Sequence, residues 1–511
     1  MVTSMRKKAK GIAQFIGLTA GWMFSFCMPS KADASAVYTL RTITITSTGA
    51  IAPTPSYPYL RLLRWLTPTT HASLIRSYIS LAPGVTFDAQ TRLAIKQRLM
   101  ALPYFSTVSV TCKQVKRNSA TMLSDLIIET KDQFPITVDV SLDEGPLCTL
   151  THHNVGGYGH RFSNQLFLKK RWGYGFIYEL PHRHGNYFLG GQCYNQTGIA
   201  YSYNYKFNYK NLWVGKLFAI QTKEPYTPYS WIIGLSSGKQ TFTARPPDTA
   251  MSNTTYQNNS FLLGKVGWVA ADYTTTRGVY RLHALETLPK GGSIEILYGY
   301  QKGKFNNRQY IGIHCIKNIA DPRLRYLHLS CSSGTFINKK RCEEAILKLA
   351  LAYAGPPIQT CKGARQFITI DYIAGYRMPK ERQLGIRRRD PESLALPDED
   401  NSMQAPIHAR LTIHLDSTLH IPIMIPPIRF ACLGFVHFIA LYNQNQALLN
   451  QTWVDSYGIG LQVEHVTMSW LAATLRIGYS PFLGKVVPSV QLSMGHFKHT
   501  TDPKPSVVAY S

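Results

Sequence analysis

The sequence predicts a transmembrane β-barrel of about 16 antiparallel strands, preceded by one small α/β domain. Three observations support this fold class. Only 16% of the 511 residues are charged, below the roughly 25% of a typical soluble domain, and 30 residues are tyrosine. Apolar and polar residues alternate from Ile136 onward, as expected of strands with one face in lipid and the other in a lumen. The chain also begins with an export-like segment.

Residues 1–36 are predicted to form a signal peptide. Basic residues between Arg6 and Lys10 precede the mostly apolar run Gly11–Cys27, and small residues follow up to Ala36, where a signal peptidase can cut. An N-terminal membrane anchor is the alternative. The signal peptide predicts that the mature chain is exported.

Residues 37–133 are predicted to form a small α/β domain with a core of its own. The expected elements are a strand at Leu40–Ile45, a short helix over 71–79, a second helix capped by Asp88, and strands at Phe105–Val110 and Leu123–Glu129. In the second helix, Ile95, Leu99 and Leu102 recur at the spacing of one helix face.

Residues 134–497 are predicted to form the barrel, and residues 498–511 a C-terminal tail. The clearest alternation places Tyr or Phe at every second position from Tyr201 to Tyr209, with Ser, Asn and Lys between them. We therefore expect these aromatic side chains to face lipid. An average of about 22 residues for a strand and its connection gives roughly 16 strands. A large soluble β-sandwich or propeller is the alternative.

Several short motifs occur along the chain in a fixed order. They are Ser73–Arg76, Leu81–Gly84 and Phe105–Val110 in the first domain, then Asn154–Gly159, Leu288–Gly292, Arg365–Phe367, Arg410–Leu411 with Asp416 and Pro422, Tyr457–Leu461 and Val490–Phe497. With these motifs the first domain resembles a POTRA domain, and the remainder resembles the barrel of the BamA/TamA superfamily, also called the bacterial surface antigen family. The resemblance covers nearly the whole chain after residue 36.

The sequence departs from this family at three places. The loop around Arg387–Gln404 lacks the family's Arg-Gly-Phe or Arg-Gly-Tyr triplet, Asp416 stands where the family more often has Glu, and fourteen residues follow Phe497. A static outer-membrane pore or surface antigen without insertase activity therefore stays open as the alternative function.

The resemblance implies an outer-membrane protein of a Gram-negative bacterium that helps to insert or export outer-membrane proteins or lipids, with its POTRA domain in the periplasm. It implies a seam between the first strand, Ile136–Leu142, and the closing strand, which opens and pairs with a client strand. The candidate seam residues of the closing strand are Val490, Leu492, Met494, Gly495 and Phe497. The candidate client edge of the POTRA domain comprises Phe105, Val108 and Val110, with Leu123–Glu129 as the alternative.

Two further groups of candidate residues are the turn that opens the barrel, Asn154, Gly157 and Gly159, and the lumen or loop residues Arg410 and Asp416. The expected partners are the outer-membrane lipid bilayer, unfolded outer-membrane protein clients and accessory lipoproteins. The net charge of +27, which is +23 without residues 1–36, favours a solvated basic loop surface, and a basic lumen or rim that binds the phosphates of lipopolysaccharide is the alternative. No nucleic acid is expected, because the basic residues are dispersed. No enzyme, cofactor or metal site is predicted, because no GxSxG motif precedes a helix and the paired histidines lack companion ligands.

Overall fold

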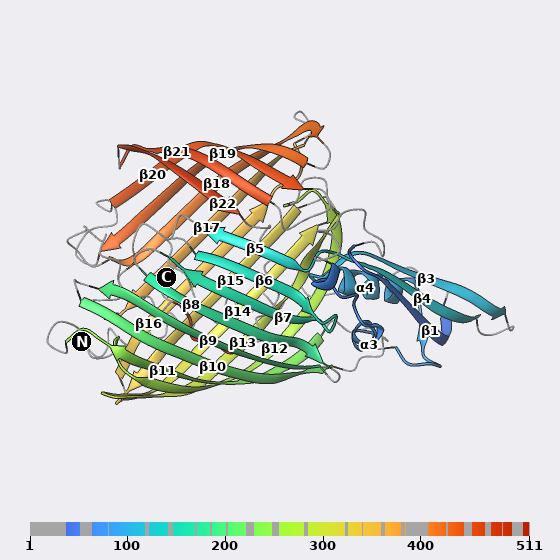
Figure 1. Ribbon diagram of the computed structural model, residues 1–511, viewed down its shortest axis with the longest axis horizontal. Helices are drawn as coiled ribbons and strands as arrows, with labels where there is room; N and C mark the ends of the chain where they lie inside the picture. The colour runs from blue at the N-terminus through green and yellow to red at the C-terminus, as the bar shows by residue number, and fades with distance from the viewer. Residues whose placement is uncertain are drawn as a thin grey trace, which may run out of the picture.

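The computed structural model describes residues 37–509 except 52–63, 80, 118–121, 142–146, 169–170, 184–185, 201–202, 221–228, 248–254, 281–284, 322–324, 340, 359–362, 380–383, 385–406, 426–427, 444–451, 466–471, 483 and 493–503. It contains a four-stranded domain and a closed β-barrel, and the domain lies beyond one end of the barrel (Figure 1). The predicted fold class is therefore confirmed. The predicted signal peptide lies outside the described residues and stays a prediction. No helix among the described residues is long and apolar enough to cross a membrane.

The N-terminal domain has the predicted strands and helices in the predicted order, with one unpredicted two-residue strand, β2, between the two helices. Its elements are β1 (Tyr38–Thr48), α3 (Ala72–Ser77), β2 (Thr86–Phe87), α4 (Ala89–Met100), β3 (Phe105–Arg117) and β4 (Met122–Asp132). The sheet has the order β2-β1-β4-β3, in which β1 and β4 are parallel and β3 and β4 are antiparallel. The second helix begins where expected, because the Asp88 side chain accepts a hydrogen bond of 2.8 Å from the Thr91 amide.

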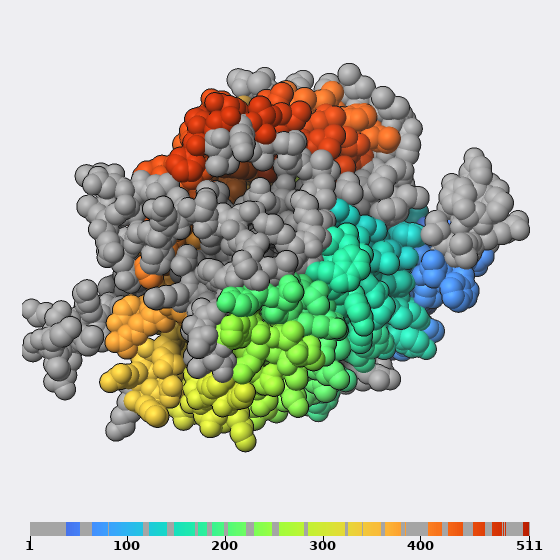
Figure 2. All heavy atoms as spheres, turned by 60° about the vertical axis from the view of Figure 1, so that its left-hand side comes forward, coloured from blue at the N-terminus to red at the C-terminus, as the bar shows by residue number. Residues whose placement is uncertain are grey.

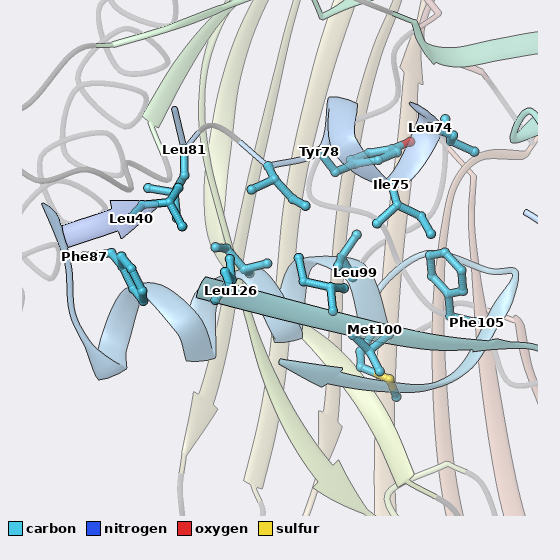
Figure 3. Packing of buried hydrophobic residues seen from close by; sticks show 14 of the residues in the cluster. Leu40, Leu74, Ile75, Tyr78, Leu81, Phe87, Leu99, Met100, Phe105 and Leu126 are labelled. Carbon is cyan, nitrogen blue, oxygen red and sulfur yellow. The ribbon is translucent and has the colours of Figure 1, made fainter. Parts of the chain in front are cut away.

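The core of this domain lies between its sheet and its two helices. Leu40 of β1, Ile75 of α3, Leu99 of α4 and Leu126 of β4 are each at most 1% exposed. These side chains belong to one cluster, which Figure 3 shows from close by. Full burial of an aliphatic side chain stabilises a fold by about 1.5–3 kcal/mol, so this small domain has a core of its own.

Strands β5 to β22 close into one barrel in which neighbouring strands are antiparallel. They are β5 (Ile136–Ser141), β6 (Leu147–Val155), β7 (His160–Phe167), β8 (Arg171–Arg183), β9 (Tyr187–Ala200), β10 (Tyr203–Ala219), β11 (Tyr229–Ala244), β12 (Asn259–Arg277), β13 (Leu285–Gly303), β14 (Asn307–Asp321), β15 (Arg325–Asn338), β16 (Arg341–Ala354), β17 (Ala364–Tyr376), β18 (Ile407–Ile425), β19 (Ile428–Asn443), β20 (Thr452–His465), β21 (Ala472–Ser480) and β22 (Lys485–Leu492).

The described barrel thus has 18 strands, two more than the number predicted. The strands nearest the two ends of the barrel sequence are short, which lowers the number of residues per strand. β5, β6, β7, β21 and β22 have 6, 9, 8, 9 and 8 residues, whereas β12 has 19.

The two ends of the barrel can be told apart by the N-terminal domain. The turn between β6 and β7 lies against this domain, because the His71 amide donates a hydrogen bond of 3.0 Å to the Gly157 carbonyl oxygen. We call this the domain end and the opposite one the far end. Since neighbouring strands are antiparallel, odd-numbered strands begin at the domain end and even-numbered strands at the far end.

The outer face of the barrel is apolar on most strands. Exposed side chains on this face include Tyr174 and Phe176, Leu212 and Val214, Trp231 and Ile233, Ile296 and Tyr298, Leu475 and Ile477. Figure 2 shows part of the wall, running from the cyan strands through the green to the yellow ones. An apolar outer face with period-two alternation is that of a barrel that spans a membrane.

The predicted direction of the aromatic side chains in Tyr201–Tyr209 is wrong for Tyr205 and Phe207. These are 2% and 0% exposed, and they pack inside the barrel with aromatic side chains of β9 and β11. Lys206 is exposed on the outer face, which it shares with Leu212 farther along β10. Because β10 begins at the far end, its first residues lie beyond the apolar band, where polar side chains face outward.

Candidate functional site: the strand seam and the domain junction

Among the described residues, two residue pairs join the first and last strands of the barrel. Val140 and Ser141 of β5 pair with Leu492 and Gln491 of β22. By contrast, β5 pairs with β6 from Ile136 to Ser141, and β22 pairs with β21 along its whole length. The described part of β22 ends at Leu492, so these two pairs are the part of the seam that the structure describes.

The closing strand begins at Lys485, earlier than the predicted Val490, and is described as far as Leu492. Val490 and Leu492 both lie in it, and Val490 pairs with Leu475 of β21. Three other predicted seam residues, Met494, Gly495 and Phe497, lie outside the described residues. β22 also contains Pro488, which lacks an amide N–H and is tolerated in strands at an edge.

The predicted client edge of the N-terminal domain lies on β3, which is an edge strand of its sheet. Phe105 and Val108 are 4% and 5% exposed, and Val110 packs against the same core. These side chains face the domain core, so the strand offers an incoming chain its backbone groups. The alternative prediction, that Leu123–Glu129 is the client edge, is wrong. These residues lie on β4, which is paired with β1 on one side and with β3 on the other.

The predicted turn near the start of the barrel sequence joins β6 to β7 at the domain end. Gly156, Gly157 and Gly159 have φ values of 65°, 79° and 70°, in the left-handed region that favours glycine. The Asn154 side-chain oxygen accepts a hydrogen bond of 2.7 Å from the Gly159 amide, and the Asn154 carbonyl accepts one of 3.2 Å from the Gly157 amide. Asn154 therefore fixes the shape of this turn.

Asn154 also connects the barrel to the N-terminal domain through buried hydrogen bonds. Its Nδ2 donates to Thr70 Oγ1 over 2.8 Å, and Thr70 Oγ1 in turn donates to Asp132 Oδ1 over 2.8 Å. The Thr70 amide donates to the other oxygen of Asp132, also over 2.8 Å. All three residues are at most 4% exposed. A buried network with its groups satisfied holds a single geometry, so it fixes the domain on the barrel.

The junction also requires residues without a side chain at Gly157 and Gly159. A Cβ atom on Gly157 would overlap the carbonyl oxygen of Thr69, and one on Gly159 would lie 2.8 Å from Leu74 Cδ2. The rings of His71 and Tyr158 stack beside them, with centroids 4.2 Å apart. The backbone of the turn therefore packs directly against the segment that leads into α3.

Sequence reasoning singled out Asn154, Gly157 and Gly159 but missed their partners Thr70 and Asp132. Burial raises the pKa of the Asp132 carboxyl, while the two hydrogen bonds from Thr70 act in the opposite direction. The sequence signal for Asp132 was weak: it is an acidic residue at the end of a strand. Its partner lies 62 residues away, so no local pattern reveals the pair.

The paired histidines of β6 also belong to this region. A ring nitrogen of His152 lies 2.9 Å from the Leu66 carbonyl oxygen, and one of His153 lies 3.1 Å from Thr137 Oγ1 of β5. In addition, the His153 amide donates to the Pro135 carbonyl over 2.8 Å. These contacts hold the start of β5 next to the junction.

Arg410 and Asp416, the predicted lumen or loop residues, both lie on β18. Leu415 and Leu419 of this strand are 40% and 45% exposed on the outer face, so Arg410 and Asp416 lie on the lumen face. Asp416 Oδ1 is 3.3 Å from His437 Nε2 on β19. The loop around Arg387–Gln404 lies outside the described residues.

No model of a known protein family matches the chain, and no curated protein does. Among solved structures, the chain is similar to BamA from Haemophilus ducreyi lacking POTRA domains 1–3, at 12% identity and a TM-score of 0.43, covering 89% of this chain and 84% of that one. It is also similar to CdiB from Acinetobacter baumannii, at 11% identity and a TM-score of 0.40, over 89% of this chain and 74% of that one. CdiB from Escherichia coli is 6% identical, with a TM-score of 0.34, over 92% and 93% of the two chains. These are likenesses of fold.

Proposed function

We propose that this protein acts in the outer membrane of a Gram-negative bacterium as a non-enzymatic factor that helps insert or export outer-membrane proteins or lipids. In this proposal the N-terminal domain is a POTRA domain in the periplasm, and the expected partners include unfolded clients, accessory lipoproteins and lipopolysaccharide. The observation that carries the proposal is that the barrel closes by pairing its first strand, β5, with its last, β22, so that the wall has a seam between two strands that are far apart in the sequence.

A seam of this kind matters because a strand edge that becomes unpaired is a template for another strand. In this proposal, β22 separates from β5, the backbone N–H and C=O groups of β5 then pair with an incoming chain, and β6 holds the other edge of β5 in register. The edge strand β3 of the N-terminal domain offers a second such edge at the domain end. An extended client can thus bind by backbone hydrogen bonds at both places.

A disulfide across the seam tests this proposal. Val140 and Leu492 are directly opposite one another, and opposite residues in antiparallel strands have Cα atoms about 4.5–5.5 Å apart, within the range that a disulfide bridges. The variant Val140→Cys/Leu492→Cys is made in a chain whose nine native cysteines are changed to Ser. The control is Leu329→Cys/Leu351→Cys, an opposite pair in the fully paired wall between β15 and β16.

The measurement is the rate at which a urea-unfolded eight-stranded outer-membrane barrel folds into liposomes that contain each variant. We expect the oxidised seam variant to lose the acceleration, a reductant to restore it, and the control pair to leave it intact. Equal acceleration by the oxidised and reduced seam variants would overturn the proposal. The barrel would then be a static pore or surface antigen.

A further inference from the structure

The C-terminal segment Lys504–Ala509 lies inside the barrel. Lys504 Nζ donates a hydrogen bond to the side-chain oxygen of Gln192 on β9, and it lies 5.3 Å from the ring centroid of Trp213 on β10. Pro505 is buried, and an ideal Cβ at Gly234 of β11 would lie 3.2 Å from its Cγ. Gln192 and Trp213 are 6% and 2% exposed, on the lumen face of their strands.

The other end of the segment contacts a different part of the wall. The Val508 amide donates a hydrogen bond of 2.9 Å to the Tyr310 hydroxyl on β14. Val508 also packs against a buried cluster that includes Ile346, Ile407 and Leu441, on β16, β18 and β19. Ile407 begins β18 and Tyr310 is near the start of β14, so these contacts are at the far end.

The two sets of contacts lie on different parts of the barrel wall: the first is on β9, β10 and β11, and the hydrogen bond of the second is on β14, with the cluster beside it extending to β19. Strands β10 and β19 are nine places apart in the ring of 18 strands, which is half of its circumference. Four peptide units between Lys504 and Val508 reach about 14 Å when extended. The segment therefore runs along the lumen side of the wall between β9 and β14, with its Val508 end at the far end of the barrel.

The wall is shaped to receive this segment. The Trp213 ring lies against Gly190, the Phe188 ring against Gly215, and the Tyr310 ring and hydroxyl against Gly334, in each case where a Cβ would overlap the aromatic side chain. Glycine at these positions lets the large side chains lie flat on the wall. The flat rings leave room for a chain between the walls and place the Tyr310 hydroxyl where it meets the Val508 amide.

We propose that residues 504–509 are a resident plug of the barrel lumen, which blocks the passage of ions and solutes until it leaves its seat. The site on the barrel wall that holds the plug binds a peptide segment with a basic residue at its start and an aliphatic residue four positions later. This inference does not depend on the proposed insertase role, because a barrel with a closed seam can hold the same plug.

Single-channel conductance in planar lipid bilayers tests the plug. A chain that ends at Pro503 is expected to conduct several-fold more than the full chain, and the added peptide Lys-Pro-Ser-Val-Val-Ala is expected to reduce its conductance again. Unchanged conductance after truncation, with no effect of the peptide, would overturn the proposal.

Two further variants keep the test decisive if the truncated chain does not fold. Tyr310→Phe removes the hydroxyl that accepts from Val508 and is expected to increase the open time, whereas Tyr298→Phe, on the outer face of β13, is the matched control. A disulfide in Gly234→Cys/Pro505→Cys, in the cysteine-free chain, is expected to hold the channel closed until it is reduced. Equal open times for the two tyrosine variants, or conduction by the oxidised disulfide variant, would contradict the plug. Neither outcome bears on client folding, so the two proposals fail separately.

Discussion

The domain junction lies at the turn between β6 and β7, the strand seam lies between β5 and β22, and the two are built in different ways. At the junction, Asn154, Thr70 and Asp132 form a buried chain of hydrogen bonds, and Gly157 has no room for a side chain. At the seam, β5 and β22 share two residue pairs within the part of the chain that the structure describes, and no buried side-chain hydrogen bond between these two strands is described. Because β5 is held beside the junction through β6, the mobile side of an opening seam is expected to be β22.

The largest effect is expected from a larger residue at Gly157, which would weaken the tightly packed junction. Gly157→Ala adds a methyl group that meets the Thr69 carbonyl, in a backbone with a φ of 79°. We expect the docking of the N-terminal domain to weaken by about 3 kcal/mol, from left-handed strain and overlap together. The measurement is the electron–electron distance distribution between spin labels at the exposed positions Val115 and Tyr298 in lipid nanodiscs.

Gly484→Ala is the matched control for this change. Gly484 has a φ of 60°, but a Cβ there would contact nothing within 4 Å. It therefore carries the backbone strain of about 1 kcal/mol without the overlap. If both variants kept the narrow distance distribution of the unmodified protein, close packing at Gly157 would not be what holds the domain.

A second experiment compares the distances across the seam with those across the continuous wall. Leu150 of β6 and Leu475 of β21 are exposed on the outer face, three strands apart across the seam, and Leu212 and Ile296 are three strands apart in the continuous wall. We expect the labelled seam pair to show a second distance component longer by about 5 Å, one strand spacing, and the wall pair to show one component. A single narrow component for both pairs would mean that the seam is as tight as the wall.

The smallest expected effect concerns pH at the junction. Burial raises the pKa of Asp132, so the docked state binds more protons than the separated state at pH values between the ordinary aspartate range, near 4, and the raised pKa. Docking is therefore expected to be strongest below that range and to weaken as the pH rises through the raised pKa. Asp132→Asn should flatten this dependence in the same distance measurement, and an unchanged slope in that variant would contradict the assignment.

Local patterns in the sequence predicted the elements well and their contacts poorly. The Asp88 cap and the order of helices and strands in the N-terminal domain follow from neighbouring residues, and the structure has both. The sequence predicts that Tyr205 and Phe207 face lipid, but both side chains face the lumen. Alternation with a period of two shows that the two faces of a strand differ, but it does not show which face meets lipid. The Thr70–Asp132 pair joins distant parts of the chain, which no spacing rule detects.

The contacts of the C-terminal segment with the barrel wall have a consequence for the order in which the protein folds. Lys504 and Val508 are near the end of the chain, and their contacts come from strands distributed over most of the barrel, from β9 to β19. That surface does not exist until these strands have joined, so the segment can be seated only after the wall is built. Its insertion is therefore a final step of biogenesis, and an occupied seat marks a molecule whose assembly has finished.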